Sequence, residues 1–297
     1  MPYITEPALL KQLVPPPSLY TTVMNAVSIA QSTPSAPISM VTSCPWRSTG
    51  TKYAHNEIFF DINEELDCIM DQFGNLISGG IFGQIECISK LSGMPHLLLT
   101  LGNRKLLPQG SIGFHHCVEI DKFDSNGTIS FIPPDGQFVL LDYSLDLMPQ
   151  QIPLIVKPTL SKTLTGIKID VSITPRISHD KTFESLTIKA HLPNASSVSF
   201  SSSFGVCSFD QISQTFMWDL NGYNTKEITK RPSVTITVNG VSSTGSIYDF
   251  HTDFRINMSN LTGIRIDALS VHAESYKPFK GGRSMVKTGR FQTRFRF

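Results

Sequence analysis

Residues 233–240 read Ser-Val-Thr-Ile-Thr-Val-Asn-Gly, which is the pattern of a β-strand that ends in a tight turn. The β-branched residues Val, Ile and Thr fit the pleated surface of a sheet, and here apolar residues alternate with hydroxyl-bearing ones. The Asn-Gly pair tolerates the positive φ that a two-residue hairpin turn demands. This stretch therefore predicts a strand followed by a hairpin turn.

The same pattern recurs along most of the chain. Apolar-centred runs at residues 57–63, 128–132 and 138–143 predict further short strands. Turn dipeptides punctuate the chain, namely Phe73-Gly74, Asn126-Gly127, Asp135-Gly136, Asn221-Gly222 and Asn239-Gly240. Many short strands separated by turns are typical of sandwiches and barrels, and no long amphipathic helix is evident after residue 43. The sequence predicts an all-β fold.

The first 42 residues differ from the rest. They contain three consecutive prolines at residues 15–17 and a stretch rich in Ser, Thr and Pro at residues 32–39. Such a composition is typical of a linker. We expect residues 1–42 to be largely irregular, with one short helix near residues 19–29.

The overall composition excludes several classes of protein. Of 297 residues, 40% are hydrophobic and 16% are charged, which indicates a folded chain of one or two domains. The formal net charge of +1 does not predict a nucleic-acid partner. The five cysteines are scattered without a C-x-x-C pair, so we expect a reducing compartment rather than a disulfide framework or a zinc site. The sequence shows no signal peptide and no apolar run of membrane-spanning length.

The C-terminal end is the one strongly basic segment. From Lys277 onward the chain carries seven Lys and Arg residues and no Asp or Glu. This end would fit anionic membrane lipid or an acidic partner. A solvated strand edge whose charges block aggregation is the simpler interpretation, and we favour it.

The sequence offers no positive case for an enzyme. It lacks G-x-S-x-G, a P-loop, H-E-x-x-H and a dinucleotide-binding glycine motif. His115, His116 and Cys117 are of metal-ligand type, but adjacent strand residues point to opposite faces, so we expect a core or turn histidine pair. Asp61 with Glu64 and Glu65 would fit acid–base chemistry, and exposed strand-end charges account for them equally well. We predict no catalytic residue, metal or cofactor.

Several motifs, in this order, resemble the mu homology domain of clathrin-adaptor medium chains. They lie at residues 45–47 (PWR), 50–53 (GTKY), 56–61 (NEIFFD), 91–97 (LSGMPHL), 114–118 (FHHCV), 129–138 (ISFIPPDGQF), 276–283 (YKPFKGGR) and 287–294 (KTGRFQTR). The Y-K-P-F-K-G run is most like the medium subunit of adaptor complex three. The resemblance covers about residues 43–294 and is looser between residues 160 and 260.

This resemblance implies an elongated all-β domain of two β-sandwich subdomains, one inserted in the other. By similarity, residues 43–153 and 262–297 form the first subdomain and residues 154–261 form the insert. Medium chains of this family also carry an N-terminal longin-like domain, which is not among these residues. Through that domain they assemble with large and small adaptor subunits on Golgi and endosomal membranes, for transport to the lysosome or vacuole.

The resemblance also implies a binding site for cytosolic tails that carry a Tyr-x-x-Φ signal, where Φ is a bulky apolar residue. The peptide adds a strand to a sheet edge, and two pockets give specificity. By similarity Phe59 packs on the tyrosine ring, Asp61 accepts the phenol hydrogen bond, and Arg283 lies over the ring. Phe59 and Asp61 alternate on one strand and so share a face.

The Φ pocket and the pairing edge follow from the same resemblance. We assign the apolar Φ pocket to Ile58, Phe60, Ile266 and Leu269. The pairing edge is assigned to Gly281 and Gly282, because glycine lets a foreign backbone come close. Plain core packing would explain the four apolar residues by themselves, and the charges of Asp61 and Arg283 favour a site.

Two positions depart from the clathrin-branch pattern. Ile88 stands where those chains have a lysine, and Gly281 where they have a tryptophan. We therefore expect weaker or differently tuned peptide binding. Two alternatives stay open: a structural or assembly module with a vestigial peptide site, and a lipid-docking module that uses the basic C-terminal strand.

Overall fold

The computed structural model describes residues 44–48, 50–109, 111–178, 181–223, 231–240 and 247–296. The chain divides into two compact units, Met1–Ser43 and Cys44–Phe297. The predicted linker and its short helix lie outside the described residues. Everything below concerns the second unit.

Strands dominate the described residues. They are β1 (Glu57–Met70), β2 (Leu76–Lys90), β3 (His96–Gly102), β4 (Ser111–Phe114), β5 (Thr128–Phe131), β6 (Gly136–Asp146), β7 (Leu154–Lys162), β8 (Gly166–Pro175), β9 (Phe183–His191), β10 (Ser197–Ser202), β11 (Val206–Asp210), β12 (Thr215–Asp219), β13 (Ser233–Asn239), β14 (Ile247–Asn257), β15 (Arg265–His272) and β16 (Phe279–Arg296). The helical elements are short, and they are η2 (Arg104–Gln109), α3 (Ile120–Asn126) and η3 (Pro149–Gln151). The predicted all-β class is confirmed, and the predicted runs fall in β1, β5, β6 and β13.

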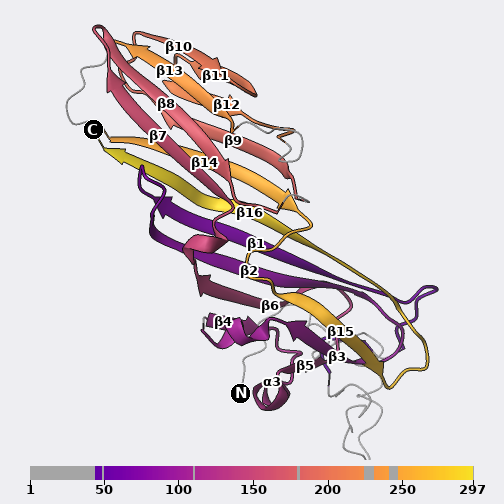
Figure 1. The fold of residues 1–297 in the computed structure, drawn as a ribbon. Coiled ribbons are helices and arrows are strands. Elements are labelled where there is room, and N and C mark those ends of the chain that lie inside the picture. The colour runs from indigo at the N-terminus through magenta and orange to yellow at the C-terminus, as the bar shows by residue number, and fades with distance from the viewer. Residues whose placement is uncertain are drawn as a thin grey trace, which may run out of the picture. The chain divides into compact units, whose positions relative to one another are not determined.

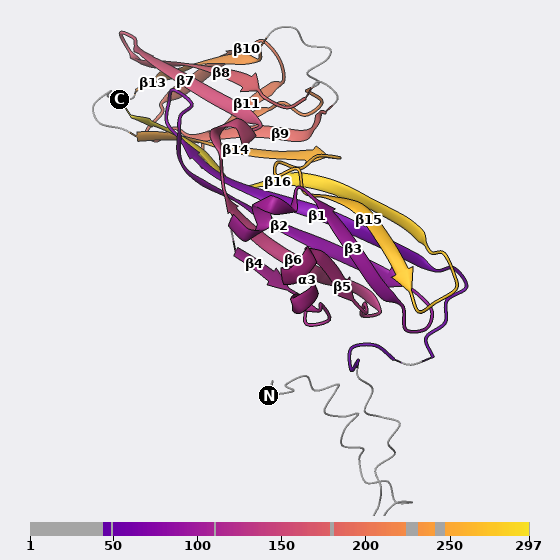
Figure 2. The same ribbon diagram turned by 60° about the horizontal axis from the view of Figure 1, so that its bottom comes forward.

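In the part of the unit that the structure describes, the strands form three sheets. A nine-stranded sheet has the order β11-β12-β9-β14-β16-β1-β2-β6-β4. A four-stranded sheet, β10-β13-β8-β7, packs at one end of it, and a three-stranded sheet, β15-β3-β5, packs at the other (Figures 1 and 2). The nine-stranded sheet is thus shared by both halves of the fold.

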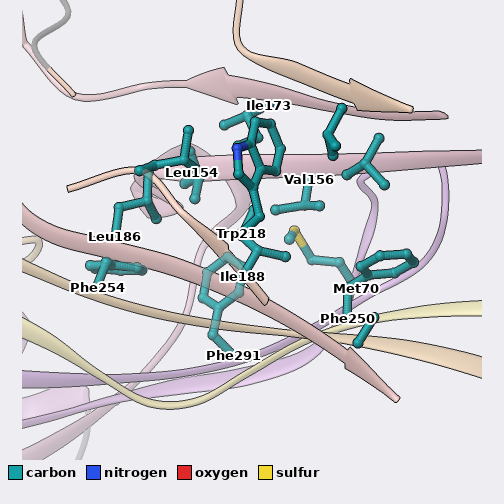
Figure 3. Close-up of a cluster of buried hydrophobic side chains, with 14 of the residues drawn as sticks. Met70, Leu154, Val156, Ile173, Leu186, Ile188, Trp218, Phe250, Phe254 and Phe291 are labelled. Atoms are coloured by element: carbon teal, nitrogen blue, oxygen red, sulfur yellow. The ribbon is translucent and has the colours of Figure 1, made fainter. Parts of the chain in front are cut away.

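Two separate hydrophobic cores result from this sharing. Strand β1 supplies Ile58, Phe60 and Ile62 to one core and Leu66, Cys68 and Met70 to the other, always with alternating residues. Alternation places these side chains on a single face of the strand. The second core, which includes Trp218, lies between the four-stranded sheet and the end of the long sheet (Figure 3). Each core thus lies between two packed sheets, which is the arrangement of a β-sandwich and agrees with the predicted two subdomains.

Glu64 lies on β1 where one core gives way to the other. Its side chain has no exposed surface, and it accepts hydrogen bonds from the Tyr143 hydroxyl at 2.8 Å and from the Leu261 amide at 2.5 Å. The Thr262 hydroxyl also donates to it. Burial and the adjacent carboxylate raise the pKa of Tyr143, so its hydroxyl remains a donor. The interpretation of Asp61 and Glu64 as exposed strand-end charges is wrong, because Asp61 is only 8% exposed and Glu64 joins three segments inside the fold.

The glycines of the five predicted turn dipeptides all have positive φ, between 67° and 89°. Gly74 lies between β1 and β2, which pair as the expected hairpin. The strands on either side of Gly136, Gly222 and Gly240 belong to different sheets, so the prediction of a hairpin after residues 233–239 is wrong. Gly127 instead caps the C-terminus of α3, where its N–H donates to the carbonyl of Phe123. A left-handed glycine serves a helix end as well as a hairpin, so the dipeptide alone does not distinguish them.

The basic C-terminal strand is for the most part not an edge. From Met285 onward β16 lies between β1 and β14, inside the nine-stranded sheet. Carboxylates on β1 contact this strand: Glu65 lies 2.8 Å from the ammonium of Lys287, and Asp67 accepts the backbone N–H of Arg290. The interpretation of this segment as a solvated strand edge is therefore wrong beyond Ser284. Because Lys287 is already paired with Glu65, fewer positive charges of this strand are available to bind anionic lipid.

The family-like motifs around residues 45–47 have a structural role. The side chain of Arg47 is fully buried and donates to the carbonyls of Leu91, Gly93 and Pro133. Trp46 donates to the carbonyl of Ile132 at 2.8 Å. The start of the domain is thereby tied to the loops that carry L-S-G-M-P and I-P-P-D-G.

His115 and His116 lie in the turn that follows β4, with ring centroids 4.0 Å apart. The expectation that these adjacent side chains point to opposite faces is wrong, because the strand ends at Phe114. Among the described residues, no three His, Cys, Asp or Glu side chains are placed to share a metal ion. None of the helices in the described ranges has the length and hydropathy that crossing a bilayer requires.

Candidate functional site

One stretch of β16 has a strand neighbour on one side only. Strand β1 pairs with β16 in parallel from Phe279 onward, with Phe59 opposite Gly281 and Asp61 opposite Arg283. On the other side β14 pairs with β16 only from Met285 onward. Within the described residues, Phe279–Ser284 therefore forms a free margin of the long sheet. An unpaired margin is a template for an added strand.

The hydrogen-bond pattern shows which backbone groups this margin offers. Phe279 donates its N–H to the carbonyl of Asn56 on the β1 side. Because bonding direction alternates along a strand, the backbone groups of Lys280 and Gly282 face away from β1. The carbonyl of Ser284 also faces away, and there the amide of Ser259 donates to it at 3.4 Å. The free margin thus ends at Ser284.

A carboxylate, a guanidinium and an aromatic ring gather on one face of the margin. The Nε and Nη2 atoms of Arg283 both lie 2.9 Å from Oδ2 of Asp61. The Asp61 side chain is 11% exposed and that of Arg283 is 74% exposed. The Phe59 ring lies close over Gly281, because a Cβ there would stand 2.7 Å from Phe59 Cδ1. Phe279 extends this aromatic surface, with its ring centroid 5.8 Å from that of Phe59.

The same face is hollowed beside Asp61. A cavity of about 570 Å³ is lined by Asp61 and Arg283 together with Glu86, Ile88 and Gln137, among others. Glu86 is held by Gln84 at 2.6 Å and by Gln137 at 3.0 Å. Three carboxylates and two guanidiniums thus line the space, since Glu184 and Arg255 also border it. Ile88 supplies an apolar wall where the clathrin branch has a lysine.

The opposite face of the margin carries a second, more apolar cavity of about 430 Å³. It separates β16 from β15, the edge strand of the three-stranded sheet. Of the predicted residues it is lined by Phe60, Ile266, Leu269, Gly281, Gly282 and Arg283. Arg283 lines both cavities, so the two lie on either side of the same strand edge.

The structure does not place every predicted residue at a surface. Ile58 has no exposed surface and packs in the core, so it lines neither cavity. Phe60, two residues further on, is 3% exposed and lines the apolar cavity. Plain core packing describes Ile58 well, because its side chain points between the two sheets.

Sequence reasoning missed most of the other residues that line these cavities, among them Ile62, Lys280 and Met258. Ile62 lines the apolar cavity, and its place two residues after Phe60 gives it the same face. Lys280 also lines it, and its ammonium donates to the carbonyl of Leu269 at 2.5 Å. Met258 borders both cavities, in a left-handed backbone conformation with φ of 54°. No sequence signal marks Met258, because its position depends on the chain crossing from β14 toward β15.

The shared long sheet, the two cores and the free margin of β16 are the features of a mu homology domain. The chain belongs to the adaptor complexes medium subunit family, whose sequence model matches residues 44–295. Members of this family are non-enzymatic components of vesicle-coat adaptors.

Within the family the chain resembles the mu subunits of the AP-3 complex. It is 34% identical over 304 residues to "AP-3 complex subunit mu-2" of Rattus norvegicus, a match that covers 99% of this chain and 71% of that protein. It is 30% identical over 298 residues to "AP-3 complex subunit mu-1" of Mus musculus, with the same coverage.

Solved structures share the fold at low sequence identity. The yeast delta-COP-I mu-homology domain has a TM-score of 0.64 at 14% identity, covering 82% of this chain and 100% of that one. The Fcho1 mu homology domain of Danio rerio, solved with a bound Eps15 peptide, has a TM-score of 0.61 at 10% identity and covers 82% of this chain and 99% of that one.

Proposed function

We propose that this chain is the cargo-recognition subunit of an adaptor coat, and that it binds Tyr-x-x-Φ signals by adding a strand to the free margin of β16. The observation that carries the proposal is the combination of that margin with the Asp61–Arg283 pair and the half-buried Phe59 ring beside it. Backbone pairing with Lys280 and Gly282 supplies affinity that does not depend on sequence.

The two cavities fit the spacing of the signal. In an extended strand, side chains three residues apart point to opposite faces. A tyrosine at the Asp61–Arg283 cavity therefore places Φ on the opposite face, where Phe60, Ile266 and Leu269 line the apolar cavity. Asp61 accepts the phenol hydrogen bond, and Phe59 with Arg283 covers the ring.

The similarity to AP-3 mu subunits supports a proposed cellular role. We place the chain in the cytoplasm, peripherally on Golgi and endosomal membranes, where it acts with large and small adaptor subunits in transport to the lysosome or vacuole. A structural module with a vestigial peptide site is the second candidate. It is favoured by two substitutions relative to the clathrin branch, because Ile88 replaces a lysine and Gly281 replaces a tryptophan. Lipid docking is less favoured, because β1 carboxylates already pair with part of the basic strand.

A peptide titration tests the proposal. Isothermal titration of the chain with a Tyr-x-x-Φ peptide and with its alanine-for-tyrosine version should show binding of the first and at least tenfold weaker binding of the second. Equal binding of both peptides, or of neither, would leave the structural module as the better description.

A further inference from the structure

The free margin fixes the direction of the added strand. Beyond Arg283 the margin is closed, because Ser259 bonds to Ser284 and β14 pairs from Met285 onward. A peptide whose tyrosine lies at Asp61–Arg283 must therefore continue toward Phe279, antiparallel to β16. Three residues span about 10 Å of strand, which brings Φ opposite Lys280.

Lys280 therefore lies beside the main chain of the bound peptide at the Φ position. Its side chain shares the face of the apolar cavity, since it lies two residues from Gly282. The side chain reaches from β16 to β15, where its Nζ atom donates to the carbonyl of Leu269 at 2.5 Å. Lys280 therefore lies at the end of the apolar cavity that the C-terminal part of the peptide would occupy.

Lys280 also differs from the other cations at this cavity in its partners. Arg283 contacts Asp61, and Arg265 lies 2.8 Å from Asp267. Within the described residues, the contact of the Lys280 ammonium is a neutral carbonyl, and no carboxylate lies within 4.0 Å of it. A carboxylate would be a stronger acceptor, because charge-assisted hydrogen bonds are stronger than neutral ones.

We propose that Lys280 binds a carboxylate that directly follows Φ. That group is either the α-carboxylate of a tail that ends at Φ or the side chain of an acidic residue in the next position. On binding, the Lys280 ammonium exchanges the Leu269 carbonyl for this carboxylate. This inference rests on the proposed peptide site. It adds a preference for signals that end the tail at Φ or that are followed directly by an acidic residue.

The test compares three fluorescein-labelled peptides by anisotropy: Tyr-x-x-Φ with a free C-terminus, the same peptide amidated, and the amidated peptide extended by Asp. Each is paired with its alanine-for-tyrosine version. The wild type should bind at least one carboxylate form about two- to fivefold more tightly than the plain amide, which is the range of an exposed ion pair. That preference should shrink at 0.5 M salt. The form that gains identifies the source of the carboxylate.

The variant Lys280→Met should bind all three peptides equally, at the affinity of the amide. Lys277→Met is the matched control, because it removes an exposed positive charge three residues away and should keep the wild-type preference. Equal binding of the three peptides by the wild type would overturn the inference, as would a preference that survives Lys280→Met. If the tyrosine peptides bind no better than their alanine versions, the peptide site itself fails.

Discussion

The guanidinium of Arg283 faces the carboxylate of Asp61 across two neighbouring parallel strands, with Nε and Nη2 both 2.9 Å from Oδ2. The carboxylate is largely enclosed by the sheet while the arginine side chain is mostly exposed. Because both contacts go to Oδ2, Oδ1 is the oxygen that the proposed site offers to a phenol hydroxyl. The pair thus fixes a buried acceptor beside an open strand edge.

Replacing Asp61 should weaken peptide binding. Asp61→Ala removes a charged acceptor, so affinity for a Tyr-x-x-Φ peptide should fall by about 1.5–3 kcal/mol, roughly ten- to 150-fold. Isothermal titration measures the change. Asp253→Ala is the control, because it removes an exposed carboxylate that pairs with Lys189 on another part of the sheet. Wild-type affinity in Asp61→Ala would remove this residue from the site.

Phosphorylation of the signal tyrosine should abolish binding. A phosphate adds about −1.5 to −2 charges next to Asp61 and Glu86, which line the same cavity. The guanidinium of Arg283 is already engaged by Asp61, and that of Arg255, which also lines the cavity, lies 3.8 Å from Glu184. Titration of matched peptides with tyrosine and phosphotyrosine gives the comparison, and equal or tighter binding of the phosphopeptide would contradict the assignment.

Glu64 and its neighbour Glu65 should differ sharply in their effect on stability. Glu64→Ala leaves two hydroxyls and one amide without their acceptor, each at about 1–3 kcal/mol, so the free energy of unfolding should fall by about 3 kcal/mol or more. Glu65→Ala breaks only an exposed pair with Lys287 and should cost about 0–1 kcal/mol. Urea unfolding of both variants measures the difference. A similar loss of unfolding free energy in the two variants would show that the three hydrogen bonds to Glu64 do not stabilise the fold.

Stability should depend on pH through His115. Burial, and secondarily the neighbouring His116, lowers the pKa of His115, whose Nδ1 atom accepts the backbone N–H of Cys117. The unfolded chain binds this proton below about pH 6.5, before the folded chain does. The free energy of unfolding should therefore be highest above that pH and fall as the pH decreases toward the lowered pKa.

The variant His115→Asn tests this dependence, because asparagine keeps an acceptor but does not titrate. Urea unfolding at pH 7.5 and 5.5 should show a smaller acid loss in His115→Asn than in the wild type. His251→Asn, at an exposed position, is the control and should retain the wild-type loss. An identical loss in all three proteins would exclude His115 as the source.

Sequence patterns predicted the strands well because each depends on a few adjacent residues. Alternation at residues 233–239 and 57–63 fixed which side chains share a face, and the motifs indicated the family. The same alternation could have identified Ile62 as a neighbour of Phe60 at the apolar cavity. It could not separate Ile58, which is sealed in the core, from Phe60, which reaches a surface.

The sequence by itself determined the β class, the strand faces and the residue types available at the site, since these follow from local spacing. Only the tertiary structure decided that, among the described residues, β16 has no second strand neighbour from Phe279 to Ser284 and is paired with β14 beyond it, because that depends on where β14 begins to pair. It also decided that, of two adjacent glutamates, Glu64 is fully buried and Glu65 is only half-buried. Burial and free margins arise from strand packing over hundreds of residues, which no local pattern encodes.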